Sequence, residues 1–133
     1  GVYILAPEAF SAMPASGCVI RTAFRHWIDH GAPVLGVVDD SPWADLGTVS
    51  EYHRLNLDLA SGLFAWPGVE PRGGCILHAS ARPSAAIRRS VIGADVTIQQ
   101  GVTLDRCVVW PSTTVSQTAR NAIITPKHRI EVS

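Results

Sequence analysis

Apolar residues recur at every fifth or sixth position through the second half of the chain, a spacing that fits neither an α-helix nor a single strand. The recurring positions are Ile87, Ile92, Ile98, Leu104, Val109 and Val115. Three similar triplets also align at separations of 17 and 15 residues: Ser90-Val91-Ile92, Cys107-Val108-Val109 and Ala122-Ile123-Ile124. An internal repeat of this kind is typical of a solenoid, in which each coil adds one short strand to every side.

We therefore expect residues 79–133 to form a short left-handed parallel β-helix. Each side would carry one inward aliphatic side chain that stacks on its equivalent in the next coil. The corners need small or turn-tolerant residues, which Gly93-Ala94-Asp95 and Gln100-Gly101 supply. A meander of short strands is the alternative, but it would not keep the same step over so many turns. So few coils need a cap at both ends, and the first half and the polar tail around Lys127 could provide them.

The first half alternates strand and helix periods. Residues 1–6 and 34–38 are apolar and rich in β-branched side chains, which predicts two buried strands. Helices are predicted over 7–13, over 19–30 and from a capping box at Thr48 to Gly62, with Tyr52, Leu55, Asn56 and Leu59 on one face. A Pro/Gly cluster then separates the halves. This gives an α/β segment over 1–66, a linker over 67–78 and the β-helix over 79–133.

Composition narrows the classes of partner. The 133 residues include 11 Lys or Arg and 11 Asp or Glu, and this balance argues against nucleic acid or an anionic membrane as partner. No apolar run reaches the roughly 20 residues of a membrane span, and no secretory leader is recognisable. Cys18, Cys75 and Cys107 have neither metal-site nor redox-motif spacing. These features predict a cytoplasmic protein with reduced thiols.

Three segments of the first half, together with the repeats, carry a family resemblance. They are Gly1 to Glu8, the W-x-D-x-G-T box from Trp43 to Thr48, and Tyr52 to Asn56. With the tail around Cys107-Val108-Val109-Trp110-Pro111, the chain resembles the C-terminal part of sugar-1-phosphate nucleotidyltransferases, in particular the mannose-1-phosphate guanylyltransferase and glucose-1-phosphate nucleotidyltransferase branches. The resemblance implies that residues 1–66 are a strand-helix-strand-helix remnant of that family's α/β sheet.

That family converts an NTP and a sugar 1-phosphate into an NDP-sugar and pyrophosphate. The resemblance implies that Asp45 is a ligand of Mg²⁺ and that Gly1 lets the backbone approach the sugar phosphate. Mg²⁺ is usually held by one or two carboxylates together with substrate phosphates, so one Asp from this segment is chemically sufficient. Without the resemblance, an Asp in front of Leu-Gly-Thr is more simply a turn residue that bonds local amides.

The other catalytic parts of the family have no counterpart here. The Gly-rich nucleotide loop, the second metal-binding Asp and the E-K-P segment are absent from the sequence. Phosphoryl chemistry then lacks the donors that stabilise its developing charge. We expect the chain alone to be inactive, with no catalytic residue and no bound cofactor, whereas its parent enzyme would use Mg²⁺, an NTP and a sugar 1-phosphate.

Several other residues allow more than one interpretation. His26 and His30 have the i, i+4 spacing of a metal-binding helix face, but no Glu or Cys accompanies them, which favours exposed histidines. Arg82 and the pair Arg88-Arg89 could bind an anion, although a solvated surface is the simpler interpretation.

Two further functions are open. Many left-handed β-helix proteins are acyltransferases, but these need more coils and a histidine base in a cleft, and His78 and His128 lie at the two ends of the expected solenoid. The chain could instead be a non-catalytic assembly module. Strands at 1–6 and 34–38 would have edges without a sheet, and such edges pair with another copy. We therefore predict a homo-oligomer.

Overall fold

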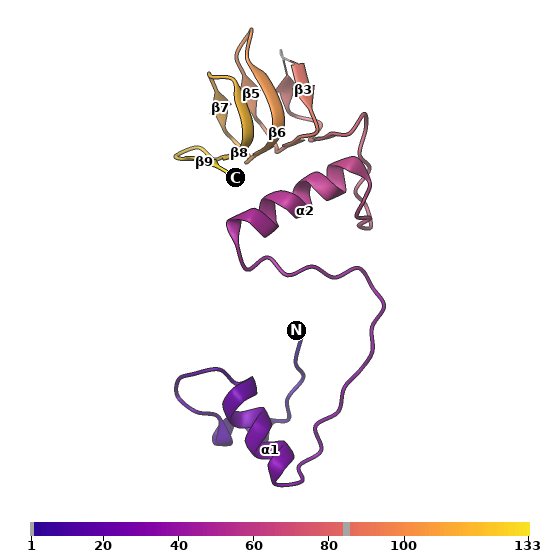
Figure 1. Ribbon diagram of the computed structural model, residues 1–133, viewed down its shortest axis with the longest axis vertical. Helices are drawn as coiled ribbons and strands as arrows, with labels where there is room; N and C mark the ends of the chain where they lie inside the picture. Colours follow the sequence, from indigo (N-terminus) through magenta and orange to yellow (C-terminus); the bar gives the residue numbers. More distant parts are fainter. Residues whose placement is uncertain (1, 84–85) are drawn as a thin grey trace. The chain divides into compact units, whose positions relative to one another are not determined.

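A computed structural model describes residues 2–83 and 86–133, and the chain divides into two units (Figure 1). The first unit ends at Asp40, and the second runs from Ser41 to Ser133. The division falls earlier than the boundary expected at residue 66. The reason is that the helix after Thr48 packs on the coils that follow it, so it belongs to the second unit.

Short helices make up the secondary structure of the first unit. They are η1 (Pro7–Ala12), a 3₁₀ helix, and η2 (Ile20–Phe24), a π-helical turn that continues directly into α1 (Arg25–Asp29). Aromatic contacts hold this unit together: the ring centroids of Tyr3 and Phe24 are 5.1 Å apart, and those of Phe24 and Trp27 are 5.4 Å apart. Both segments predicted to be helical in this unit are therefore helical.

The two strands expected in the first unit do not form. Neither 2–6 nor 34–38 belongs to a ladder among the described residues, and the side chains of Ile4 and Val37 are 98% and 91% exposed. A β-branched segment becomes a strand only where a neighbour accepts and donates its backbone hydrogen bonds. The apolar pattern is real, but the part of the chain that the structure describes places no such neighbour beside it.

Parallel ladders organise the second unit. Its described strands are β1 (Ile76–Leu77), β2 (Arg82–Pro83), β3 (Ala86–Arg88), β4 (Val91–Ile92), β5 (Thr97–Ile98), β6 (Thr103–Val109), β7 (Thr114–Val115), β8 (Ala119–Ile124) and β9 (Arg129–Glu131). All pairs are parallel except β8 with β9. Partner residues such as Val91 and Val108, or Cys107 and Ala122, are 17 or 15 positions apart. The alignment predicted from the three triplets is confirmed.

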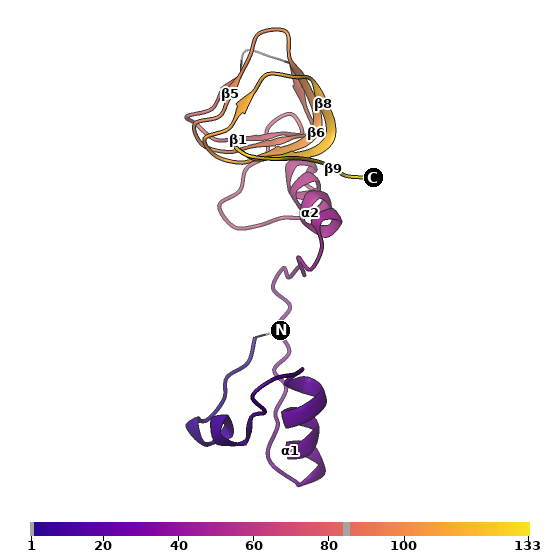
Figure 2. The same ribbon diagram turned by 90° about the vertical axis from the view of Figure 1, so that its left-hand side faces the viewer.

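The ladders form three faces around one interior, and Figure 2 shows the coils outlining a triangle. The helix face consists of β1, β4 and the second halves of β6 and β8. The threonine face consists of β2, β5 and β7. The arginine face consists of β3 and the first halves of β6 and β8. One circuit of the chain therefore visits each face once.

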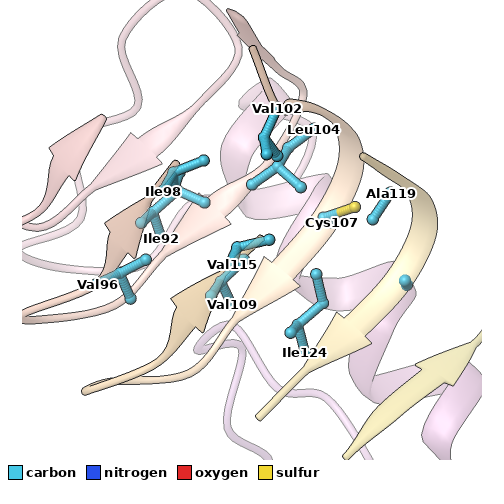
Figure 3. Close-up of a cluster of buried hydrophobic side chains, with 11 residues drawn as sticks. Ile92, Val96, Ile98, Val102, Leu104, Cys107, Val109, Val115, Ala119 and Ile124 are labelled. Atoms are coloured by element: carbon cyan, nitrogen blue, oxygen red, sulfur yellow. The ribbon is translucent and has the colours of Figure 1, made fainter. Parts of the chain in front are cut away.

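Aliphatic side chains fill the interior (Figure 3). One inward residue per strand stacks on its partner in the next coil, as in the column Ile92, Val109 and Ile124 of the helix face. The buried cluster contains Ile92, Val96, Ile98, Val102, Leu104, Cys107, Val109, Val115, Ala119, Ala122 and Ile124. Most of the apolar positions that recur in the sequence are thus in this core, and Ile87 packs at its edge.

Among the described residues, the helix face alone is apolar on its outer side. Alternation along the strands points Val91, Val108 and Ile123 outward, yet Val108 and Ile123 are buried. The helix α2 (Val49–Ser61) packs against β4 and β6 and provides the cover. The described outward positions of the other two faces are mainly Thr, Arg and Asp, which water can solvate. An amphipathic helix is therefore needed on one side only.

Both ends of α2 lie where the sequence predicts them. The Thr48 hydroxyl accepts a hydrogen bond from the Glu51 amide at 3.2 Å and donates one to the Glu51 carboxylate at 2.8 Å. Gly62 ends the helix in the left-handed conformation at φ 79°. The predicted capping box and C-cap are confirmed.

The stack begins and ends with local turns. β1 lies inside the stretch 67–78 that was expected to be a linker, because the turn from Arg72 to Cys75 leads Ile76 directly onto Val91. At the other end, Thr125 accepts the amides of Lys127 and His128, and this turn folds β9 back along β8. The polar tail therefore covers the last strand of the helix face.

Alanine at Gly93 should destabilise the coils. A Cβ atom there would lie 2.7 Å from the backbone nitrogen of Pro111 and 2.9 Å from its Cδ. Since overpacking of this kind costs about 1–3 kcal/mol, Gly93→Ala should lower the free energy of unfolding by that amount in a urea titration. Gly36→Ala is the matched control because no atom lies within 4 Å of its Cβ position. Equal stability of the two variants would contradict the close stacking of Pro111 on Gly93.

Candidate functional site

Asp45 lies on an exposed segment shortly before α2. A Cβ atom on Gly47 would be 4.0 Å from Asp45 Oδ1 and 3.6 Å from Glu51 Oε2, so both carboxylates border this glycine. The Glu51 carboxylate is already bonded to the Thr48 hydroxyl. Within 2–83 and 86–133, no group of three or more His, Cys, Asp or Glu side chains is arranged to hold a metal ion. Gly1, the expected sugar-phosphate residue, lies outside the described residues.

The two helix histidines form no paired site. The rings of His26 and His30 are stacked at 4.1 Å between centroids. The His30 Nδ1 atom lies 2.8 Å from the His26 carbonyl, a hydrogen bond within their own helix. Both residues are exposed. The geometry agrees with the interpretation of exposed helix histidines.

A shallow hollow lies between the first two coils, lined by Ala79, Ser80, Ala81, Asp95, Val96 and Thr97. Its polar groups hold the corner together. The Ser80 hydroxyl lies 2.9 Å from His78 Nδ1 and accepts the Asp95 amide at 2.9 Å. His78 Nδ1 accepts this hydroxyl and the Ser80 amide, so this ring nitrogen is already engaged at the coil corner.

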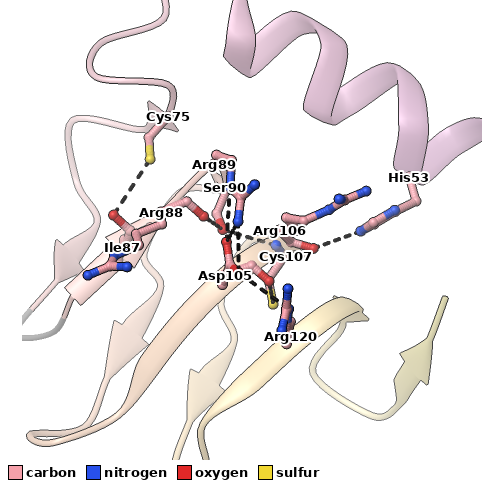
Figure 4. A network of polar contacts seen from close by, with 10 residues as sticks. All are labelled: His53, Cys75, Ile87, Arg88, Arg89, Ser90, Asp105, Arg106, Cys107 and Arg120. Carbon is pink, nitrogen blue, oxygen red and sulfur yellow. Dashed lines mark hydrogen bonds and ion pairs between the residues drawn. The ribbon is translucent and has the colours of Figure 1, made fainter. Parts of the chain in front are cut away.

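A buried hydroxyl joins two coils beneath the arginine face (Figure 4). Ser90 is fully buried. Its hydroxyl donates to the Arg88 carbonyl at 2.7 Å and accepts the Cys107 amide at 2.9 Å. Cys107, also fully buried, donates its thiol to the Asp105 carbonyl at 3.5 Å. This network fixes the corner from which the neighbouring arginines project.

Burial raises the pKa of the Cys107 thiol above its usual value, and its hydrogen bonds with the backbone at Ala122 and Asp105 offset only part of the effect. A raised pKa in the folded state means that folding disfavours the thiolate. The contribution to stability is therefore complete below the unfolded thiol pKa of about 8.5 and is lost as the pH rises through the folded pKa. We expect the free energy of unfolding to fall as the pH rises above about 8.5.

Cys107→Ala should remove the part of this alkaline loss that Cys107 causes, and Cys18→Ala should not, because Cys18 is exposed. The measurement is the pH dependence of urea unfolding for the three proteins. An identical loss in Cys107→Ala and the unmodified chain would contradict the assignment to this thiol.

Charged residues from three coils meet on the arginine face and its adjoining corner. Strand register aligns Arg88 with Asp105 and Asp105 with Arg120. The next residue in each coil, at the corner, is Arg89, Arg106 or Asn121. We call these six residues the arginine grid. They include four Arg and one Asp, a net formal charge of +3.

The Asp105 carboxylate forms ion pairs with two of these arginines. Arg89 Nη2 lies 2.8 Å from Asp105 Oδ1 and 3.0 Å from Oδ2, and Arg120 Nε lies 3.4 Å from Oδ2. The guanidinium groups of Arg88 and Arg106 have no hydrogen bond or ion pair with any described residue. The grid therefore has more donors than acceptors, and it is exposed apart from Asp105 and Asn121.

The corner of the grid has a left-handed backbone, as the coil corners at Asp95 and Ser112 also do. Arg89, Arg106 and Asn121 have φ values of 45°, 56° and 46°, in the left-handed region. That conformation costs an ordinary L-residue roughly 1–2 kcal/mol, and Asn tolerates it better. The backbone of this corner therefore favours Asn, which stands at position 121, over the arginines that stand at positions 89 and 106.

Sequence reasoning identified Arg88 and Arg89 but not Arg106 or Arg120. The signal that could have found them is the repeat itself, because shifts of 17 and 15 residues place Arg106 and Arg120 next to Arg89 and Asp105. The zero net charge also conceals an asymmetry. From Ile76 to Ser133 there are seven Arg or Lys and three Asp or Glu, a net formal charge of +4.

Comparison of the chain with models of protein families, with curated proteins and with solved structures finds no match. None of the helices in 2–83 and 86–133 has the length and apolar character to cross a membrane.

Proposed function

We propose that this chain is the C-terminal part of an NDP-sugar pyrophosphorylase, an enzyme that forms an NDP-sugar and pyrophosphate from an NTP and a sugar 1-phosphate. The observation that carries the proposal is the path of the chain through 43–61. The W-x-D-x-G-T box leads into α2, and α2 packs on the apolar outer side of the helix face. In this proposal the coils are a left-handed parallel β-helix that serves as the tail of the enzyme.

The exposed apolar segments of the first unit support the same proposal. Val2, Ile4, Leu35, Val37 and Val38 are each at least 88% exposed. Aliphatic side chains of this kind are normally buried, so two segments with several of them exposed are candidates for an interaction surface. In the parent enzyme these segments are strands of a sheet whose other strands carry the nucleotide loop and the second metal-binding Asp. The chain alone is then inactive.

Asp45 fits its proposed role chemically. It is an exposed carboxylate, and Mg²⁺ takes one or two carboxylates with water and substrate phosphates as its other ligands. When bound, Mg²⁺ neutralises charge on the phosphates as the sugar phosphate attacks the α-phosphorus and pyrophosphate leaves. Asp45 contributes one anionic oxygen donor from the residues before α2. The Thr48–Glu51 capping box fixes the end of that segment.

The test uses the protein made from the complete reading frame that contains this chain. Pyrophosphate release is measured with NTPs, a panel of sugar 1-phosphates and Mg²⁺. Asp45→Asn should lower kcat about 100-fold or more, because it removes a charged ligand of the catalytic metal. Asp95→Asn is the matched control, since Asp95 lies on a coil corner and Asn tolerates its φ of 55°. Full activity in Asp45→Asn would contradict the assignment.

A non-catalytic assembly module is the second candidate, and the exposed segments 2–6 and 34–38 favour it because unpaired apolar strands associate. The expected homo-oligomer is part of this candidate. Light scattering of the purified chain should give a mass of at least two copies, whereas a monodisperse monomer would contradict it. Both candidates place the protein in the cytoplasm, with its three thiols reduced.

A further inference from the structure

We propose that the arginine grid binds a small soluble anion that carries two or more phosphate groups. The inference does not depend on the proposed function. It rests on the placement of Arg88, Arg89, Arg106 and Arg120 on one corner of the coils and on the backbone conformation of that corner.

The first argument is the supply of donors. A guanidinium group presents a planar fork of N–H donors that matches phosphate oxygens. The Asp105 carboxylate forms ion pairs with Arg89 and Arg120. The guanidinium groups of Arg88 and Arg106 have no such partner among the described residues. Asp105 therefore orients the centre of the grid, and the guanidinium groups around it are available to a ligand.

The second argument is spacing. Neighbouring parallel strands lie about 4.8 Å apart, so the backbones at Arg89 and Arg106 are one strand apart. Those at Arg88 and Arg120 are two strands apart, at about 10 Å. A chain of phosphates or a bisphosphate is long enough to follow this row and to contact guanidinium groups of all three coils at once, which gives it more charge-assisted contacts than a single phosphate can make. Three coils are also shorter than the site of at least about four nucleotides that a single nucleic-acid strand needs.

The third argument is the unfavourable backbone. Left-handed φ values at Arg89 and Arg106 oppose the intrinsic preference of arginine, and the third coil has Asn121 at the same corner. Residues held in sparsely populated backbone conformations are found more often at functional sites than elsewhere. Asn or Gly would suit this turn better, so the two arginines stand at this corner against the local backbone preference.

The experiment measures binding of tripolyphosphate to the purified chain by titration calorimetry at low and moderate ionic strength. The test variant is Arg88→Gln with Arg106→Asn. The control is Arg21→Gln with Arg25→Gln, which removes the same charge from the first unit, where Arg25 has only an exposed ion pair with Asp29. The test variant should bind about tenfold more weakly or worse, since two charge-assisted contacts are lost, and the control should change affinity less than about twofold.

Thermal unfolding separates binding from folding. Arg106→Asn relieves the left-handed backbone and keeps the carbonyl that accepts His53, so the test variant should melt at the same temperature or higher. Weaker binding by a protein that is equally stable or more stable supports the proposal. The proposal is overturned if the unmodified chain does not bind tripolyphosphate, or if test and control variants weaken binding equally. It is also overturned if the chain binds only vesicles that contain phosphatidylinositol bisphosphate, or prefers a single-stranded oligonucleotide to tripolyphosphate.

Discussion

Replacement of Leu104 by alanine is expected to lower the free energy of unfolding of the second unit by about 2–5 kcal/mol. Leu104 is 1% exposed and belongs to the interior cluster. Its strand is paired on both sides, to Ile87 through β3 and to Ala119 through β8. Because backbone hydrogen bonds hold both neighbours in place, the surrounding coils have little freedom to close the cavity. The change is measured by urea unfolding followed by circular dichroism.

Thr114→Ala is the control for this variant. Thr114 is exposed on the threonine face, and its loss should change the free energy of unfolding by no more than about 0.5 kcal/mol. Similar losses at Leu104 and Thr114 would mean that the coils lack a close-packed interior.

The second large effect is expected at His53, where alanine should cost about 2–3 kcal/mol. His53 is buried on α2, and its Nε2 atom donates to the Arg106 carbonyl at 2.8 Å (Figure 4). Alanine would leave that carbonyl without its donor and open a gap between helix and coil. The outer residues Val108 and Ile123 would then lose part of their cover. Urea unfolding gives the change in stability.

Arg54→Ala is the matched control on the same helix. Arg54 is exposed and pairs with Asp58 one turn away at 2.9 Å, an interaction that contributes about 0.3–0.5 kcal/mol. If His53→Ala were no more destabilising than Arg54→Ala, the helix would not be anchored to the coils through His53.

The repeat was predictable because its period is directly visible in the amino-acid sequence. The triplets at Val91, Val108 and Ile123 have the register of the helix face, and the recurring aliphatic residues form the core. The capping box at Thr48 was equally readable, since it depends on a few neighbouring residues. Local chemistry and a short repeat need no knowledge of the rest of the fold.

The position of α2 was not predictable in the same way. Sequence periodicity grouped Tyr52, Leu55 and Leu59 as its apolar face, whereas the buried residues are His53 and Ala60. A histidine counts as polar until a partner such as the Arg106 carbonyl is known. The buried side of the helix is therefore decided by a contact 53 residues away along the chain.

Long-range partners also explain the remaining differences. Residues 2–6 and 34–38 have the composition of strands, but a strand exists only with a neighbour, and the described chain places none beside them. From the sequence, only Arg88 and Arg89 of the arginine grid were recognised as a possible anion site. The other members come from later coils. The role expected of Asp45 comes from the family resemblance. The other groups that this role requires are not among the described residues.

Backbone hydrogen exchange tests most directly the central structural claim, that α2 and the coils form one cooperative body. We predict that the amides of α2 around His53 and Ala60 open with nearly the same free energy as those of β6, and that residues 34–38 exchange much faster in dilute solution. Exchange of the α2 amides several orders of magnitude faster than those of β6 would contradict the claim, because the helix would then detach while the coils remain folded.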